Sequence, residues 1–69
     1  MTHEQFRIWR KGHFSSQAKA ADALGVSQES VALYERGSRR GSDPRPVIIP
    51  RTVELACAAI AAGITGYTG

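Results

Sequence analysis

The sequence predicts a compact all-α domain of four short helices, with a fifth helix as the alternative. Apolar residues recur at helical spacing, and alanine, a strong helix former, is abundant in the middle and at the end of the chain. Glycines also stand where several of the helical patterns end. The 69 residues suffice for a single domain, which we expect over residues 1–64, with a flexible tail over 65–69.

The first helix is expected to begin after Thr2 and to end at Gly12. Gln5 stands three residues after Thr2, and the two form a capping-box pattern. Phe6 and Trp9 share one face of this helix, so both are predicted to lie in the core.

The second and third helices are expected to be joined by a tight turn. Ser16 can cap the second helix, which ends at Leu24, and Gly25 can adopt the left-handed conformation that stops it. Ser27 can cap the third helix, which ends before Gly37. Small or apolar residues stand where two crossing helices must touch, at Ala20, Ala21, Leu24, Val26, Val31 and Tyr34. This arrangement is typical of a helix-turn-helix, whose second helix commonly lies in the DNA major groove.

Glycine, serine and proline predict a loop after the third helix. Two interpretations remain open for Val47–Ile49, which either anchors this loop to the core or forms a short strand at a dimer contact. The fourth helix is expected from Pro50 to about Ala62. It has almost no polar face, so it must be buried on nearly all sides. We therefore expect a homodimer whose interface contains Val53, Cys57, Ile60, Ala61 and Ile64.

The size and composition of the chain also favour a homodimer. A domain this small hides only about 60% of the surface that its unfolded chain exposes, so its stability is marginal. Cys57 is the only cysteine, which excludes a disulfide framework. His3 and His13 lie outside any zinc-ligand spacing and are expected to be exposed. No metal or cofactor is predicted, and oligomerisation remains the source of additional stability.

The net charge of +3 is unevenly distributed. Five arginines and one acid, Asp43, lie between Arg36 and Arg51. Such a cluster next to a helix-turn-helix indicates a surface for a polyanion. The chain has no signal-peptide pattern and no apolar run near the ~20 residues of a membrane span, so we expect a cytoplasmic protein with no membrane partner.

The central segment resembles the Cro and CI repressor type of helix-turn-helix, the XRE-like family with the lambda-repressor-like fold. The matching residues are Ser16-Gln17, Ala21, Leu24-Gly25-Val26-Ser27, Val31 and Tyr34-Glu35-Arg36-Gly37. The resemblance implies a transcriptional regulator of a bacterial or phage-infected cell. By its size and the lack of an effector domain, the chain also resembles small repressors found beside anti-CRISPR genes in phages. It departs from the family in having four helices rather than five and a proline-rich loop before the last helix.

The resemblance implies that a homodimer binds an inverted-repeat operator in double-stranded DNA, with the third helix in the major groove. The base-contacting residues would be Gln28, Glu29, Ala32 and Leu33. The backbone-contacting residues would be Ser16, Gln17, Ser27, Ser30, Arg36, Arg39, Arg40 and Arg45. Arg10 and Glu35 match a family pair that bridges the first helix to the end of the third, so we expect an ion pair there.

Two other classes of binding protein compete with a repressor. An antitoxin-type module would use the same fold to mask a partner protein, with the apolar fourth helix against that partner. An architectural or excision factor would bend DNA, although no winged hairpin or apolar wedge is evident. We expect no enzymatic activity, because the sequence pairs no nucleophile with a base and contains no phosphate-cradling loop. No small-molecule effector is evident either.

Overall fold

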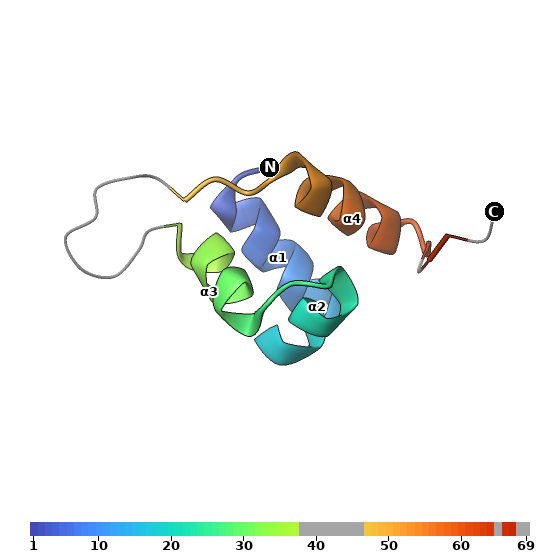
Figure 1. The fold of residues 1–69 in the computed structure, drawn as a ribbon, viewed down its shortest axis with the longest axis horizontal. Helices are drawn as coiled ribbons and strands as arrows, with labels where there is room; N and C mark the ends of the chain where they lie inside the picture. Colours follow the sequence, from blue (N-terminus) through green and yellow to red (C-terminus); the bar gives the residue numbers. More distant parts are fainter. Residues whose placement is uncertain (38–46, 65, 68–69) are drawn as a thin grey trace.

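The chain is all-helical in a computed structural model that describes residues 1–37, 47–64 and 66–67. Within these ranges it forms four helices and no strand, in agreement with the predicted fold class (Figure 1). The helices are α1 (His3–His13), α2 (Gln17–Leu24), α3 (Gln28–Arg36) and α4 (Arg51–Ala61). No fifth helix occurs in the described ranges, although the rest of the chain lies outside them.

The predicted capping box at the start of α1 is present. The Thr2 hydroxyl accepts a bond from the Gln5 backbone N–H at 3.0 Å, and the Thr2 N–H donates to Gln5 Oε1 at 2.8 Å. The predicted stop at Gly12 is wrong, because α1 continues through Gly12 to His13. The continuation carries Phe14 onto the core, where its ring lies 5.6 Å from that of Trp9, centroid to centroid. Glycine lowers helix stability but does not forbid the helical conformation, so this packing decides where α1 ends.

Glycine conformation determines where α2 and α3 end, as predicted. Gly25 follows α2 with φ of 71°, and Gly37 follows α3 with φ of 79°. Side chains with a Cβ rarely adopt this left-handed region. At the other ends, the hydroxyls of Ser16 and Ser27 accept bonds from the backbone N–H groups of Lys19 and Ser30. Residues 25–27 therefore form a short turn between two capped helices.

The core is formed by side chains from all four helices and from the segment before α4. The buried members of this cluster are Phe6, Trp9, Ala20, Ala21, Val31, Ile49, Val53 and Cys57. Trp9 also donates its indole N–H to the backbone carbonyl of Cys57 at 3.0 Å, which joins α1 directly to α4. The predicted core positions Phe6, Trp9 and Val31 are thus confirmed.

The segment before α4 anchors the chain to the core, as one of the two interpretations of Val47–Ile49 expected. Val47 and Ile49 are buried, whereas Ile48 between them is 75% exposed. This alternation inserts every second side chain into the core, and none of the three residues belongs to a strand. A strand at a dimer contact therefore finds no support in this segment.

His3 is not the exposed residue that the sequence suggested. Its Nδ1 lies 2.7 Å from the backbone carbonyl oxygen of Tyr34, near the end of α3. The ring also approaches Gly37 so closely that a Cβ built there would lie 2.8 Å from His3 Cδ2. His3 therefore joins the start of α1 to the end of α3. His13 is exposed, as expected, and its ring lies 5.7 Å from the Trp9 ring.

The structure corrects the predicted dimer interface at two positions on α4. Val53 is 7% exposed and Cys57 is 1% exposed within a single chain, so their side chains cannot also face a partner. Ile60 is half-buried against the same core. Ala61 is exposed on α4, as are Leu55 and Ala58, and Ile64 after the helix is exposed as well. The surface left open thus includes the predicted Ala61 and Ile64 but not the predicted Val53 and Cys57.

No described helix combines the length and apolar character needed to cross a membrane.

Candidate nucleic-acid interface

The N-terminal half of α3 presents an accessible polar edge. Gln28 and Glu29 are exposed, whereas Ala32 and Leu33, one helical turn later, are half-buried. Residues four apart on a helix lie on the same side, so these four side chains form two adjacent rows. The predicted base-contacting residues therefore share one edge of α3, and the two polar members are the most accessible.

Val31 on α3 turns into the core and is fully buried. Tyr34 packs partly against the same core, with its ring 5.5 Å from that of Phe6. These two contacts hold α3 on α1 and α2, so the edge that carries Gln28 and Glu29 rests on a packed support.

Ser27, at the start of α3, acts first as a helix cap. Ser27 Oγ accepts from the Ser30 backbone N–H at 3.1 Å and lies 2.9 Å from Ser30 Oγ. Ser16 fills the same role for α2, where its Oγ accepts from the Lys19 N–H at 3.2 Å. All three hydroxyls thus already make intramolecular hydrogen bonds.

One carboxylate connects three helices beside this interface. Glu35, on α3, accepts a bond from Arg10 Nε of α1 through one oxygen and pairs with it as predicted. Its other oxygen accepts from Gln17 Nε2, at the start of α2, at 2.7 Å. Arg10 additionally donates to the Phe14 carbonyl at 3.4 Å. The side chains of Arg10 and Glu35 are only 13% and 10% exposed, so this network is largely shielded from water.

The network keeps Glu35 charged. Burial by itself would raise the pKa of this carboxyl, but the hydrogen bonds from Arg10 and Gln17 and the positive charges of Arg10 and Lys11 outweigh it. The pKa of Glu35 is therefore below its ordinary value. Because the carboxylate remains ionised, the Arg10 charge is neutralised within the fold.

The bond between Gln17 and Glu35 was not foreseen from the sequence. The predicted phosphate contact of Gln17 named no partner within the fold, whereas one of its N–H groups is engaged with Glu35. The separation of 18 residues left no local signal for this contact. A buried acid in α3 within reach of the α2 N-terminus can be recognised only when the crossing of the two helices is known.

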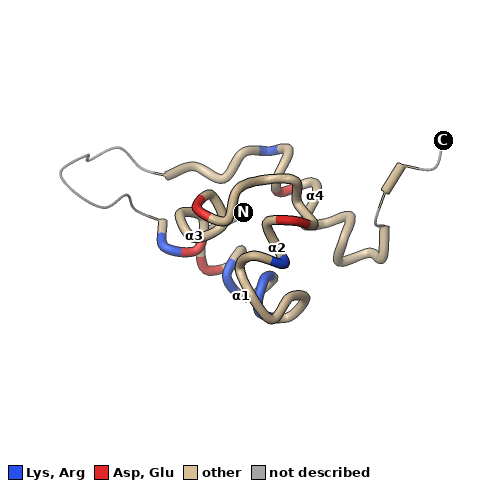
Figure 2. Tube along the Cα trace, turned by 60° about the horizontal axis from the view of Figure 1, so that its bottom comes forward, with Lys and Arg blue, Asp and Glu red and all other residues tan. Residues whose placement is uncertain are grey.

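Charge is nearly balanced on the first three helices. Residues 1–37 contain five basic side chains, Arg7, Arg10, Lys11, Lys19 and Arg36, and four acidic ones, Glu4, Asp22, Glu29 and Glu35. Figure 2 shows basic and acidic positions on the same part of the molecule. Arg36 lies at the exposed end of α3. The predicted phosphate contacts Arg39, Arg40 and Arg45 lie outside the described residues.

Lys19 is an exposed cation that the sequence interpretation did not select. It lies on α2, and its Nζ donates to Ser15 Oγ at 3.1 Å. This bond draws the ammonium group toward the N-terminal end of α2, where Ser16 and Gln17 also lie. Cations next to a helix N-terminus are suited to positioning an anion such as a phosphate.

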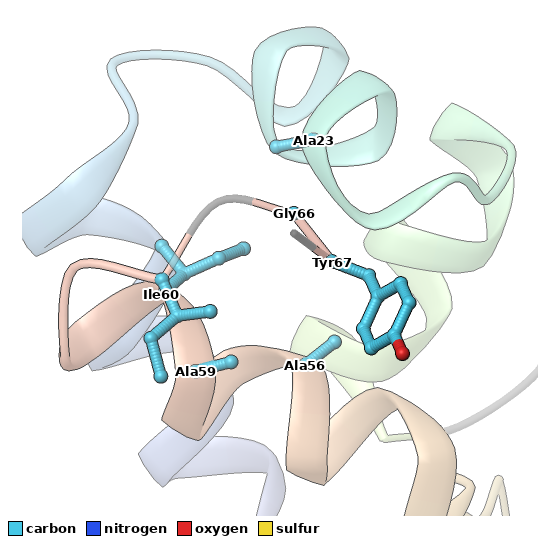
Figure 3. Close-up of a pocket in the computed structure, with 7 residues that line it drawn as sticks. Ala23, Ala56, Ala59, Ile60, Gly66 and Tyr67 are labelled. Atoms are coloured by element: carbon cyan, nitrogen blue, oxygen red, sulfur yellow. The ribbon is translucent and has the colours of Figure 1, made fainter. Parts of the chain in front are cut away.

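A shallow apolar hollow lies between α2, α4 and the segment after α4 (Figure 3). Ala56, Ala59 and Ile60 form its α4 side, Ala23 faces them from α2, and Tyr67 lies at its edge. Ile64 and Gly66 complete the lining. Ile64 is 57% exposed and Tyr67 is 96% exposed. This hollow suits an apolar protein contact better than a polar ligand.

The described residues contain no group of three or more His, Cys, Asp or Glu side chains arranged to hold a metal ion. Cys57 is buried in the core, and burial together with the nearby Glu54 charge raises the pKa of its thiol to about 11.

Comparisons with models of protein families, with curated proteins and with solved structures give no match for this chain.

Proposed function

We propose that this chain is a sequence-specific, double-stranded-DNA-binding transcriptional regulator of the Cro/CI type that acts as a repressor. A homodimer would bind an inverted-repeat operator and insert α3 of each subunit into a major groove. The dimer would place the two α3 helices about 34 Å apart, one turn of DNA.

The observation that carries this proposal is the accessible edge of α3. Two capped helices are joined by a short turn at Gly25, which has φ of 71°, and the second presents exposed Gln28 and Glu29. The amide of Gln28 can bond an adenine edge, and the carboxylate of Glu29 can accept from a cytosine amino group. Leu33 offers apolar contact to a thymine methyl.

Contacts to the DNA backbone would come from the start of α2 and from the chain after α3. Gln17 and the N–H groups at the α2 N-terminus would bind one phosphate. Arg36, Arg39, Arg40 and Arg45 would add charge contacts on the other side of α3. Since these contacts carry little sequence information, specificity would depend on the α3 edge.

The dimer contact would use the open face of α4 in place of the buried positions first expected. Leu55 on α4 is 54% exposed, and the small side chains of Ala58 and Ala61 lie on the same helix. Ile64, which follows the helix, is 57% exposed. A second copy would remove these apolar surfaces from water, which is favourable by about 25 cal/mol per Å².

The experiment that tests the proposal measures where and how tightly the protein binds DNA. Selection from a random duplex library should recover an inverted repeat, and a footprint upstream of the protein's own gene should protect it. Affinity should fall steeply with salt, because each neutralised phosphate contributes a slope of about −0.9. Failure to bind any duplex at low salt would sink the proposal.

Two variants separate base contacts from backbone contacts. Gln28→Ala should lose about 1–3 kcal/mol of preference at one base pair while retaining its affinity for random DNA. Arg39→Ala should weaken binding to all sequences alike and reduce the salt slope. Equal losses on specific and random DNA for Gln28→Ala would contradict the role given to α3.

The second candidate function, an antitoxin-type module that masks a partner protein, is favoured by the apolar hollow next to α4. In that case the hollow and Leu55 would contact a different chain. Light scattering of the purified protein separates the two, because a stable homodimer favours the repressor and a monomer that binds no DNA favours the antitoxin.

A further inference from the structure

The bond between Gln17 and Glu35 links the fold to the proposed phosphate contact. Gln17 is the first residue of α2, and Glu35 lies in the last turn of α3. The two meet at 2.7 Å between Gln17 Nε2 and Glu35 Oε2, in a part-buried position.

A side-chain amide has two N–H donors and one carbonyl oxygen. Glu35 takes one N–H of Gln17, which leaves the second N–H as a donor from the same nitrogen. A glutamine without a partner must lose its rotamer freedom when it binds a ligand, and this loss weakens binding. The bond to Glu35 immobilises Gln17 before DNA arrives.

A carboxylate beside a DNA phosphate would ordinarily oppose binding. Arg10 neutralises it here, because the guanidinium pairs with the Glu35 oxygen that does not bond Gln17. The three side chains thus present an oriented amide without an unbalanced negative charge.

We propose that Glu35 is a positioning residue for DNA binding, whose carboxylate holds the Gln17 amide so that its second N–H donates to a backbone phosphate. This inference rests on the proposed function and extends it, because it gives the acid of the Arg10–Glu35 pair a role in binding as well as in folding. The alternative is that the bond serves only to join α2 to α3.

A matched pair of variants separates the two roles. In an Arg10→Met background, Glu35→Gln keeps an acceptor oxygen for Gln17, whereas Glu35→Leu removes it. Both variants remove the two charges together, so neither strands a buried ion. Gln17→Ala is then added to each, which completes a double-mutant cycle measured by binding to a short duplex.

We expect the Glu35→Leu background to bind DNA about tenfold more weakly than the Glu35→Gln background, the scale of a hydrogen bond to a charged group. Gln17→Ala should lower the affinity for DNA about tenfold in the Glu35→Gln background and almost not at all in the Glu35→Leu background. The salt slope should not change, because no charge contacting a phosphate is removed. Helicity measured at the same temperature shows whether each variant is folded.

An equal loss of DNA affinity from Gln17→Ala in the two backgrounds would overturn the inference. No loss of affinity in either background would overturn it too. If the wild-type chain binds no duplex at low salt, the proposed function itself fails, which is a different outcome from an additive cycle. Should the variants fail to fold, NMR of the wild-type side-chain amide gives the answer. The Gln17 amide should be rigid in the free protein, and DNA should shift one of its two protons, whereas a mobile amide or two unshifted protons would refute the inference.

Discussion

At the scale of single residues, Glu35 of α3 accepts hydrogen bonds from side chains of α1 and α2. Arg10 and Gln17 supply these bonds, and both side chains of the ion pair are nearly buried. Removing one partner of such a pair strands a charge and costs up to ~3–5 kcal/mol, whereas replacing both together costs far less. The network therefore determines which substitutions the fold tolerates at these positions.

Acid should destabilise the protein through Glu35. Because the folded pKa of this carboxyl lies below its unfolded value, its contribution to stability is complete above the unfolded pKa and is lost as pH falls through the folded pKa. Urea unfolding across about pH 2–7 should show this loss. Glu35→Gln in the Arg10→Met background, which strands no buried charge, should flatten it. An unchanged pH profile in this double variant would contradict the role of the Glu35 carboxyl.

The Cys57 thiol should react slowly in the folded protein. Burial and the Glu54 charge raise its pKa from 9.0 to about 11, and the side chain is 1% exposed. The thiolate fraction near pH 8 should therefore be about 100-fold lower than in the unfolded chain. Iodoacetamide labelling followed by mass spectrometry, with and without denaturant, measures this, and equal rates in the two conditions would contradict the burial of Cys57. The folded pKa of the thiol is higher than the unfolded one, so the unfolded chain loses its proton first. The free energy of unfolding should therefore decrease as pH rises from about 9 toward 11.

At the scale of elements, each helix ends where backbone conformation or core packing requires it. Gly25 ends α2 because its φ of 71° suits a residue without a Cβ. α1, in contrast, passes through Gly12 and ends only where Phe14 reaches the core. The short turn after Gly25 allows α3 to cross α2 at the distance that the small side chains of Ala20 and Ala21 permit.

Two alanine substitutions of glycine should have opposite effects. Gly25→Ala places a Cβ at positive φ and should destabilise the protein by about 1 kcal/mol. Gly12→Ala lies within α1, meets no atom within 4 Å, and should stabilise it by about 0.5–1 kcal/mol. Thermal unfolding of the two variants against wild type measures both effects. A lower melting temperature for Gly12→Ala would argue against a helical Gly12.

At the scale of the whole molecule, the open face of α4 and the edge of α3 are separate surfaces (Figure 1), so the proposed dimer contact and the proposed DNA contact do not compete. The core of one chain already contains Val53 and Cys57. Leu55 and Ile64 remain outside it, more than half exposed. A molecule this small gains considerable stability if a second copy covers such residues.

Leu55→Glu should dissociate the proposed homodimer. It places a charge in an apolar contact, and we expect the dimer dissociation constant to rise at least about tenfold, since burying a leucine is worth about 1.5–3 kcal/mol. Sedimentation or light scattering over a concentration series measures this. Ile8→Glu is the matched control, because Ile8 is an apolar residue of similar exposure, 64%, on a different helix, α1. A wild-type chain that remains monomeric, or an Ile8 variant that dissociates equally, would contradict the α4 contact.

Local sequence patterns were sufficient for the existence of the four helices and for the ends of α2 and α3, but not for the end of α1. Caps at Thr2, Ser16 and Ser27 act through residues three positions away, and Gly25 and Gly37 act through their own φ angles. Such signals lie within one turn of the chain, so sequence patterns predicted the ends of α2 and α3. The Arg10–Glu35 pair came from the family resemblance, and the structure contains it.

The burial of α4 and the partners of polar side chains depended on tertiary structure. The nearly uniform apolar character of α4 indicates that the helix must be covered. It does not indicate which face the same chain covers, so Val53 and Cys57 were wrongly assigned to a dimer interface. The contacts of His3 with Tyr34 and of Gln17 with Glu35 join residues 31 and 18 positions apart. These contacts exist only because the helices cross at particular angles, and the crossing depends on the packing of the whole core rather than on any local pattern.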